Sequence, residues 1–152
     1  MSKDLQAHTA QPAATMESVE RYFKNDRFAE RADIQLLAVS PGQARAKMTL
    51  HPHHLNGYGT VQGGAIFTLA DFAFAAASNS HGTIAVAINV SITFLKAVSR
   101  GRLRAEAREL SCNPRLGSYT VEVRDDAGDL VAVFQGLAYR KPDRLPLDDP
   151  AR

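Results

Sequence analysis

The sequence predicts an α+β fold in which a curved, six-stranded antiparallel sheet wraps around one long central helix, with a short helix at the N-terminal side. The segment 63–80 is apolar on nearly every side, which is typical of a buried helix. Six other segments have the composition of strands, and the clearest, 84–94, alternates large apolar residues with small or polar ones. The simplest packing of these elements sets the long helix against the sheet.

The predicted elements follow one another in a simple order. They are helix 18–31, strands 32–39 and 43–50, loop 51–62, helix 63–80, and strands 84–94, 103–110, 119–124 and 130–140. Pro41-Gly42 makes a turn between the first two strands, Gly82 ends the long helix, and DDAG at 125–128 joins the last two strands. A helix buried on so many sides needs more cover than one sheet supplies, so we expect a second copy of the chain to pack against it.

Length and composition bound the class of protein. The chain has 152 residues, of which 45% are hydrophobic and 22% charged, as in ordinary soluble domains. We expect one domain at 16–141, a loose N-terminal tail at 1–15 and a disordered C-terminal tail at 142–152. The single cysteine, Cys112, excludes an intrachain disulfide and a multi-thiolate zinc site, and it favours a reducing compartment.

The charges and the apolar segments argue against two kinds of partner. The 18 Lys and Arg against 16 Asp and Glu leave a formal charge of +2 without any basic run, which argues against nucleic acid. No secretory signal is visible, and the longest apolar segment, 63–77, contains Asp71 and is too short to span a bilayer. We therefore expect a cytoplasmic protein that does not bind membranes.

The most specific pattern lies between the second strand and the long helix. Residues 56–64 read NGYGTVQGG, and Asp71 follows seven residues after the last glycine, inside the helix. This pattern resembles the PaaI-type (phenylacetic acid degradation) family of hot-dog-fold acyl-CoA thioesterases, whose motif is roughly Asn-x-x-Gly-Thr-x-His-Gly-Gly followed by a helix with that acid. The similarity extends over residues 30–141, including the FLKA that ends the strand 84–94.

The resemblance implies an activity and a set of residues. Such enzymes hydrolyse acyl-CoA thioesters to a free acid and coenzyme A, without a metal or a bound cofactor. Their sites lie between the two subunits of a homodimer, and many pair their dimers into tetramers. The resemblance assigns catalytic or substrate-binding positions to Asn56, Thr60, Val61, Gln62, Gly63, Gly64 and Asp71.

Gly63 and Gly64 fit the need to stabilise negative charge on the thioester carbonyl oxygen. They open the long helix, where the first backbone N–H groups lack intrahelical partners and the helix end is positive. Glycine also lets a substrate approach the backbone closely. By the family match the Gly63 amide is the principal donor. The alternative is that both glycines only permit a tight loop or close packing.

Asp71 is the candidate general base or nucleophile. Burying an unpaired carboxylate costs on the order of several kcal/mol, so its presence in an apolar helix suggests a function. The alternative is a carboxylate satisfied by a neighbouring amide or hydroxyl. Asp71 lies eight residues after Gly63, or about 12 Å along the helix, which is too far for both to act on one thioester. Two antiparallel helices would bring Gly63 of one subunit near Asp71 of the other, so the spacing alone predicts a two-fold dimer with composite sites.

Two positions need separate interpretation. Asn56 matches the family's loop asparagine, which helps to hold the attacking water or the carbonyl, although Asn-Gly is also a common turn pair. Gln62 replaces the family's histidine, and glutamine exchanges hydrogen bonds but cannot titrate. This replacement keeps a non-catalytic acyl-CoA binder open as an alternative. A hot-dog dehydratase or hydratase, which uses a histidine with an acid, ranks below both.

The remaining polar residues form weaker patterns. Arg115, in a turn, suits either a phosphate of coenzyme A or solvent, and neither is favoured. His51, His53 and His54 lack an evident third ligand, and Pro52 favours a surface turn, so we expect no metal.

Overall fold

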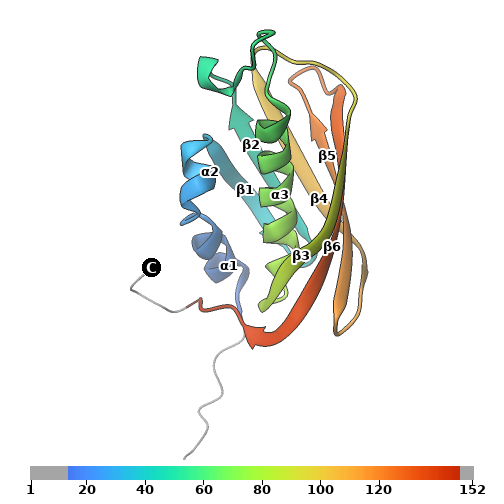
Figure 1. Ribbon diagram of the computed structural model, residues 1–152. Helices are drawn as coiled ribbons and strands as arrows, with labels where there is room; N and C mark the ends of the chain where they lie inside the picture. The colour runs from blue at the N-terminus through green and yellow to red at the C-terminus, as the bar shows by residue number, and fades with distance from the viewer. Residues whose placement is uncertain (1–13, 148–152) are drawn as a thin grey trace, which may run out of the picture.

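The six strands form one antiparallel sheet in the order β1-β2-β4-β5-β6-β3, and the long helix α3 lies against its concave face (Figure 1). The computed structural model describes residues 14–147. Its elements are α1 (Met16–Phe23), α2 (Arg27–Arg31), β1 (Ile34–Ser40), β2 (Gln43–Thr49), the 3₁₀ turn η1 (Pro52–His54), α3 (Gly63–Asn79), β3 (Thr83–Phe94), β4 (Arg102–Cys112), β5 (Leu116–Arg124) and β6 (Leu130–Arg144). The predicted sheet and long central helix are confirmed.

The packing of α3 against the sheet builds the core. Leu69, Ala73 and Phe74 of the helix are buried, and the ring of Phe74 contacts those of Tyr119 and Phe134, with centroids 5.5 Å apart in each pair. Phe74 also fills the space above Gly136 on β6, where a Cβ atom would lie 2.8 Å from the ring. Glycine at this position therefore lets the helix approach the sheet closely.

The predicted helix 18–31 is wrong as a single element, because two short helices, α1 and α2, take its place. Asp26 lies at the break. Its backbone N–H donates to the Phe23 carbonyl (3.2 Å), and its side chain caps α2 by accepting from the Ala29 N–H (2.9 Å). Aspartate favours such caps over helix interiors. Both helices contact β1 and α3, so they cover a second side of the long helix.

The end of the chain is ordered further than the predicted strand 130–140. β6 continues to Arg144 because its last residues still pair with the start of β3, where Thr83 lies opposite Arg144. Leu145 beyond it is buried. Of the expected disordered tail at 142–152, residues 142–144 instead belong to β6 and 148–152 lie outside the residues that the structure describes, as do residues 1–13 of the expected tail at 1–15.

β3 forms one edge of the sheet and presents apolar side chains. Val86, Ile88 and Phe94 are 37, 55 and 51% exposed, and Leu95 follows at 54%. An edge strand with this many exposed apolar side chains is a surface that proteins normally cover. Across residues 14–147, no helix is long and apolar enough to cross a membrane.

Gly136→Ala tests how tightly α3 packs on the sheet. The new methyl group would lie 2.8 Å from the Phe74 ring, so the ring or the helix must shift. We expect the free energy of unfolding to fall by about 1–3 kcal/mol in urea denaturation. Gly57→Ala is the matched control, since no atom of residues 14–147 other than its chain neighbours lies within 4 Å of its Cβ position. Equal stability of the two variants would contradict the packing argument.

Candidate active site

The first turn of α3 has one hydrogen-bond donor without an acceptor among residues 14–147. Gln62 caps the helix, because its Oε1 accepts from the Gly64 N–H (2.9 Å) and its carbonyl accepts from the N–H groups of Ala65 (2.9 Å) and Ile66 (3.3 Å). The Gly63 N–H is the donor left over. It lies at the positive end of the helix, where an anionic oxygen is stabilised.

The loop before α3 is held by its own hydrogen bonds. Asn56 Oδ1 accepts from the backbone N–H groups of Tyr58 (2.9 Å) and Thr60 (3.2 Å), and Asn56 Nδ2 donates to Thr60 Oγ1 (3.1 Å). Val61 is buried, and its N–H donates to the Val98 carbonyl (2.8 Å), which ties the loop to the β3–β4 connection. The side chain of Asn56 is thus engaged in its own turn, and these residues shape the loop that leads into the helix.

The ring of Phe94 lies over the glycine that opens α3. A Cβ atom on Gly63 would be 3.1 Å from Phe94 Cζ, so glycine permits this close approach. Phe94 ends β3 and is half exposed, and it therefore gives the free N–H an apolar, solvent-accessible neighbour. The sequence marked Phe94 only as the end of a strand and as part of the family similarity. The contact of Phe94 with Gly63 joins two segments that are far apart along the chain, so no local pattern in the sequence indicates it.

Asp71 lies half buried on α3, and no described residue donates a hydrogen bond to its carboxylate. Burial raises the pKa of this carboxyl group above its usual value, and the negative charge of Asp26 raises it further. A carboxylate satisfied by a neighbouring amide or hydroxyl, the alternative considered for this position, is not seen within residues 14–147. An unpaired acid with a perturbed pKa is typical of a functional group.

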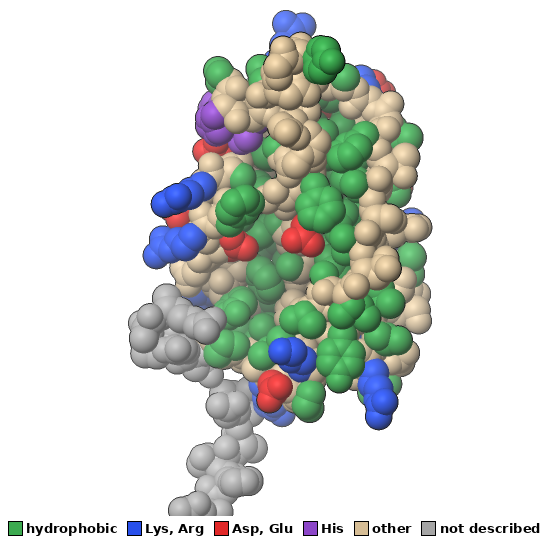
Figure 2. Space-filling view, in the orientation of Figure 1, with side chains coloured by type: hydrophobic (Ala, Val, Ile, Leu, Met, Phe, Trp, Pro, Cys, Tyr) green, Lys and Arg blue, Asp and Glu red, His purple; other side chains and the backbone are tan. Residues whose placement is uncertain are grey.

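One face of α3 is left open by the rest of the protomer. Gly64, Thr68, Asp71 and Ala75 are exposed or partly exposed, at spacings of four, three and four residues, which line one side of a helix. Figure 2 views the molecule from the side of α3 and shows hydrophobic side chains over much of this face, with separate acidic groups among them. This face has the character of a surface that packs against another molecule.

The structure gathers only part of the predicted site within one protomer. The loop residues and both glycines lie together at the start of α3, whereas Asp71 is eight residues further on, about 12 Å along the helix axis. Arg115 lies at the opposite end of the helix. Its carbonyl accepts from the Arg140 N–H (2.8 Å), and the side chain of Arg140 contacts Thr83, which follows α3. The protomer alone therefore does not bring the donor and the carboxylate to one reacting carbon.

The loop histidines take part in structural contacts. His54 is buried, its Nδ1 accepts from the His51 N–H (2.9 Å), and its Nε2 donates to the Ala32 carbonyl (2.9 Å). His53 Nε2 contacts the carboxylate of Asp33 at 2.7 Å. Both ring nitrogens of His54 are thus engaged with the backbone.

Comparison with known proteins places the chain in a family. Residues 58–132 match the family model of the Thioesterase superfamily. A relative from Archaeoglobus fulgidus is 41% identical over 91% of this chain and 91% of its own length. Acyl-coenzyme A thioesterase PaaI of Escherichia coli K12 is 35% identical over 78% of this chain and 85% of its own length. This chain belongs to the thioesterase superfamily.

Solved structures of similar proteins agree with this assignment. The PaaI protein from the phenylacetic acid degradation operon of E. coli has a TM-score of 0.81 at 30% identity, covering 86% of this chain and 99% of its own. A Streptococcus mutans UA159 protein bound to acetyl-CoA has a TM-score of 0.70 at 25% identity, covering 74% of this chain and 91% of its own. The predicted hot-dog fold and PaaI-type family are confirmed, and with them the class of thioester hydrolase.

The pKa of Asp71 is expected to lie above the ordinary value of an aspartate, and Asp26→Asn is expected to lower it. Removing the negative charge of Asp26 makes the ionised form of Asp71 more favourable. Asparagine also caps helices well, so α2 should persist. Carbon NMR titration of the carboxyl groups measures the change, and Asp129→Asn, in the turn between β5 and β6, serves as the control. An unchanged Asp71 midpoint in Asp26→Asn would rule out this charge as a cause.

Proposed function

We propose that this protein hydrolyses an acyl- or aryl-acyl-CoA thioester to the free acid and coenzyme A, at composite sites between two subunits. The free N–H of Gly63 at the start of α3 is the observation that carries the proposal. The relative named acyl-CoA thioesterase PaaI and the S. mutans protein bound to acetyl-CoA support an acyl-CoA substrate. The mechanism invokes no cofactor, since coenzyme A is part of the substrate.

The Gly63 N–H stabilises the oxyanion in this mechanism. Negative charge builds on the carbonyl oxygen as the carbonyl carbon is attacked, and an N–H group fixed at a helix N-terminus stabilises that charge without having to reorganise. Gln62 engages the neighbouring Gly64 N–H, so the substrate oxygen meets one free backbone donor there. The half-exposed ring of Phe94 beside Gly63 offers an apolar contact to the substrate chain.

Asp71 drives the attack on the thioester. As a general base it takes a proton from the attacking water; as a nucleophile it attacks the carbonyl carbon itself, and water then cleaves the resulting anhydride. Both routes use the ionised carboxylate and release the thiolate of coenzyme A. Hydrolysis is therefore expected to increase as the pH rises through the raised pKa of Asp71.

Two uncovered surfaces support a homodimer. The open face of α3 contains Asp71, and the free edge of β3 exposes Val86 and Ile88. Antiparallel packing of two α3 helices through the open face would bring Gly63 of each subunit near Asp71 of the other. Such an arrangement completes two sites that each protomer holds only in part.

A second candidate function is a non-catalytic acyl-CoA binder. It is favoured by Gln62, which stands where the family has a histidine and whose side chain is used to cap α3. A capping glutamine positions the helix but moves no proton. If the protein is such a binder, an acyl-CoA should bind to it tightly without being hydrolysed.

Gly63→Pro removes the proposed oxyanion donor from the backbone. Proline is favoured at the first position of a helix, and Gln62, with φ −60° and ψ 132°, already has a conformation suited to a residue before proline. We expect kcat to fall by about 100- to 1,000-fold. The assay is thiol release from phenylacetyl, hydroxyphenylacetyl, benzoyl and straight-chain CoA esters.

Gly63→Ala is the matched control for this variant. It keeps the N–H group and adds a Cβ atom at the same place beside Phe94, so its loss of activity should be much smaller. Equal activity of the two variants would remove the N–H group from the mechanism. Calorimetric binding of the esters to the parent protein without any turnover would favour the binder.

Mixed dimers test the composite site. Asp71→Asn and Gly63→Pro should each be inactive alone, but a dimer of one with the other holds one site with both groups intact. Random pairing makes about half of the dimers mixed, each with one active site, so about one quarter of the parent activity should return. Glu106→Gln, on the outer face of β4, controls for loss of a carboxylate and should stay active. A mixed dimer without activity, or a stable active monomer, would contradict the composite site.

A further inference from the structure

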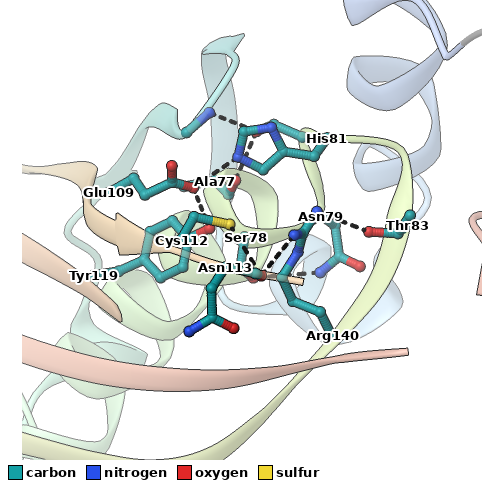
Figure 3. Close-up of polar contacts among 12 residues, drawn as sticks. Ala77, Ser78, Asn79, His81, Thr83, Glu109, Cys112, Asn113, Tyr119 and Arg140 are labelled. Atoms are coloured by element: carbon teal, nitrogen blue, oxygen red, sulfur yellow. Dashed lines mark hydrogen bonds and ion pairs between the residues drawn. The ribbon is translucent and has the colours of Figure 1, made fainter. Parts of the chain in front are cut away.

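A second polar cluster lies at the far end of α3 from the glycine pair, and the proposed thioester chemistry does not use it. His81 follows Ser80, the C-cap of α3. Glu109 and Cys112 lie on β4, Tyr119 on β5 and Arg140 on β6. Figure 3 shows these side chains converging from separate elements on one small region. No pattern in the sequence indicates that these side chains lie together, because they are far apart along the chain.

A bulge in β4 turns Glu109 and Cys112 to the same side. Residues three apart on a regular strand point to opposite faces of the sheet. Here the register with β5 shifts between Glu109 and Ser111, which leaves Leu110 as an extra residue without a partner. Bulges re-aim side chains in this way and are frequent next to functional sites.

Glu109 is held in place from several directions. Its Oε2 accepts from the Tyr119 hydroxyl (2.5 Å) and from His81 Nε2 (2.7 Å). Gly117 makes room, since a Cβ atom there would lie 2.7 Å from the Tyr119 ring. Burial alone would raise the pKa of Glu109, but the hydrogen bonds from Tyr119 and His81 and the charges of His81 and Arg140 outweigh it and lower the pKa. Glu109 is therefore present as a carboxylate.

We propose that His81, Glu109 and Cys112 bind one divalent transition-metal ion of the zinc class. Their ligand atoms, one each of nitrogen, oxygen and sulfur, all lie within 4.8 Å of one another. Zinc takes this donor set in proteins, whereas calcium and magnesium take oxygen ligands. The ion replaces the proton between His81 and Glu109, and three protein ligands leave a fourth position for water.

Arg140 provides a second, independent observation. Its Nη1 donates to the Asn113 carbonyl (2.8 Å) and its Nη2 to Thr83 Oγ1 (3.5 Å), but its Nε is buried and has no hydrogen-bond partner among residues 14–147. Cys112 Sγ contacts the same Asn113 carbonyl at 3.8 Å, so the thiol lies beside the guanidinium group. Buried donors are rarely left unpaired. A metal-bound thiolate at Cys112 would accept a hydrogen bond from Arg140 Nε. Polar groups around a metal site commonly donate hydrogen bonds to its ligands.

The other cluster of metal-binding residue types is less suited to an ion. It consists of Asp33, His53 and His54. Both ring nitrogens of His54 already have backbone partners, so the ring would have to give up the Ala32 or the His51 contact to bind a metal. The absence of a metal at the loop histidines stays a prediction, and the proposed ion lies elsewhere.

Metal binding at this site is an exchange of protons for an ion, without a redox step. Bonds form from the ion to the histidine nitrogen, the carboxylate oxygen and the thiolate sulfur. The thiol proton passes to solvent, and the proton on His81 Nε2 moves to Nδ1 or to solvent. Affinity therefore rises with pH. Because the ion joins the residue after α3 to β4 in the folded state only, the free energy of unfolding also rises with metal concentration.

Titration of the purified protein with Co²⁺ and Zn²⁺ tests the proposal. Thiolate-bound Co²⁺ absorbs in the near ultraviolet through sulfur-to-metal charge transfer, so the parent should gain this band at one equivalent and lose it to excess Zn²⁺. Cys112→Ser should abolish the band, and His81→Ala should weaken Zn²⁺ binding by about tenfold or more in calorimetry. Neither variant should change acyl-CoA hydrolysis.

His53→Ala, which removes an exposed histidine of the other cluster, is the matched control and should bind metal like the parent. The proposal is overturned if the parent binds neither ion, if Cys112→Ser binds as tightly as the parent, or if His53→Ala loses the ion and His81→Ala keeps it. Circular dichroism checks that each variant is folded. Cys112 is exposed, so its substitution decides the question even where His81→Ala fails to fold.

Discussion

The structure depends on one requirement, which is that the apolar α3 be covered on every side. Burying apolar surface stabilises a fold by about 25 cal/mol per Å², so each uncovered side of this helix is a loss. The sheet covers one side around Phe74, and α1 covers a second, where the rings of Phe23 and Phe72 meet with centroids 6.3 Å apart. The third side holds Asp71 and stays open in the protomer. This open side of α3 favours packing against a second molecule, and it also leaves the carboxylate of Asp71 accessible to a substrate.

The fold was predictable from the sequence wherever a hydrophobic pattern repeats over many residues. It was not predictable where a single side chain determines where a helix or strand begins or ends. α3 and the alternating strands have long periodic signals. The break between α1 and α2 comes from a single cap, Asp26, whose side chain accepts from the Ala29 N–H. The predicted strand 130–140 ended too early because Pro142 argues against a strand. In the structure β6 continues past this proline to Arg144, and proline is tolerated at a strand end where the pairing is irregular.

At the candidate site, residue type and spacing were enough to select the glycines and the acid, and three-dimensional contacts supplied the rest. Which N–H group stays free depends on where Gln62 directs its side chain. The influence of Asp26 on Asp71 exists only because α2 folds against α3. His81 and Glu109 are 28 positions apart, so their contact has no local signal in the sequence.

The loop that leads into α3 has a consequence for how substrates are distinguished. A bridge between Leu55 and Val61 joins its ends, and Asn56 and Thr60 pair within it. A loop whose polar atoms are already paired gives up those hydrogen bonds if it rearranges, so rearrangement has a cost in free energy. Under the proposed function, discrimination between acyl chains would follow the shape around Phe94, and a poorly fitting chain would be rejected by weak binding instead of by failure to trigger an induced fit.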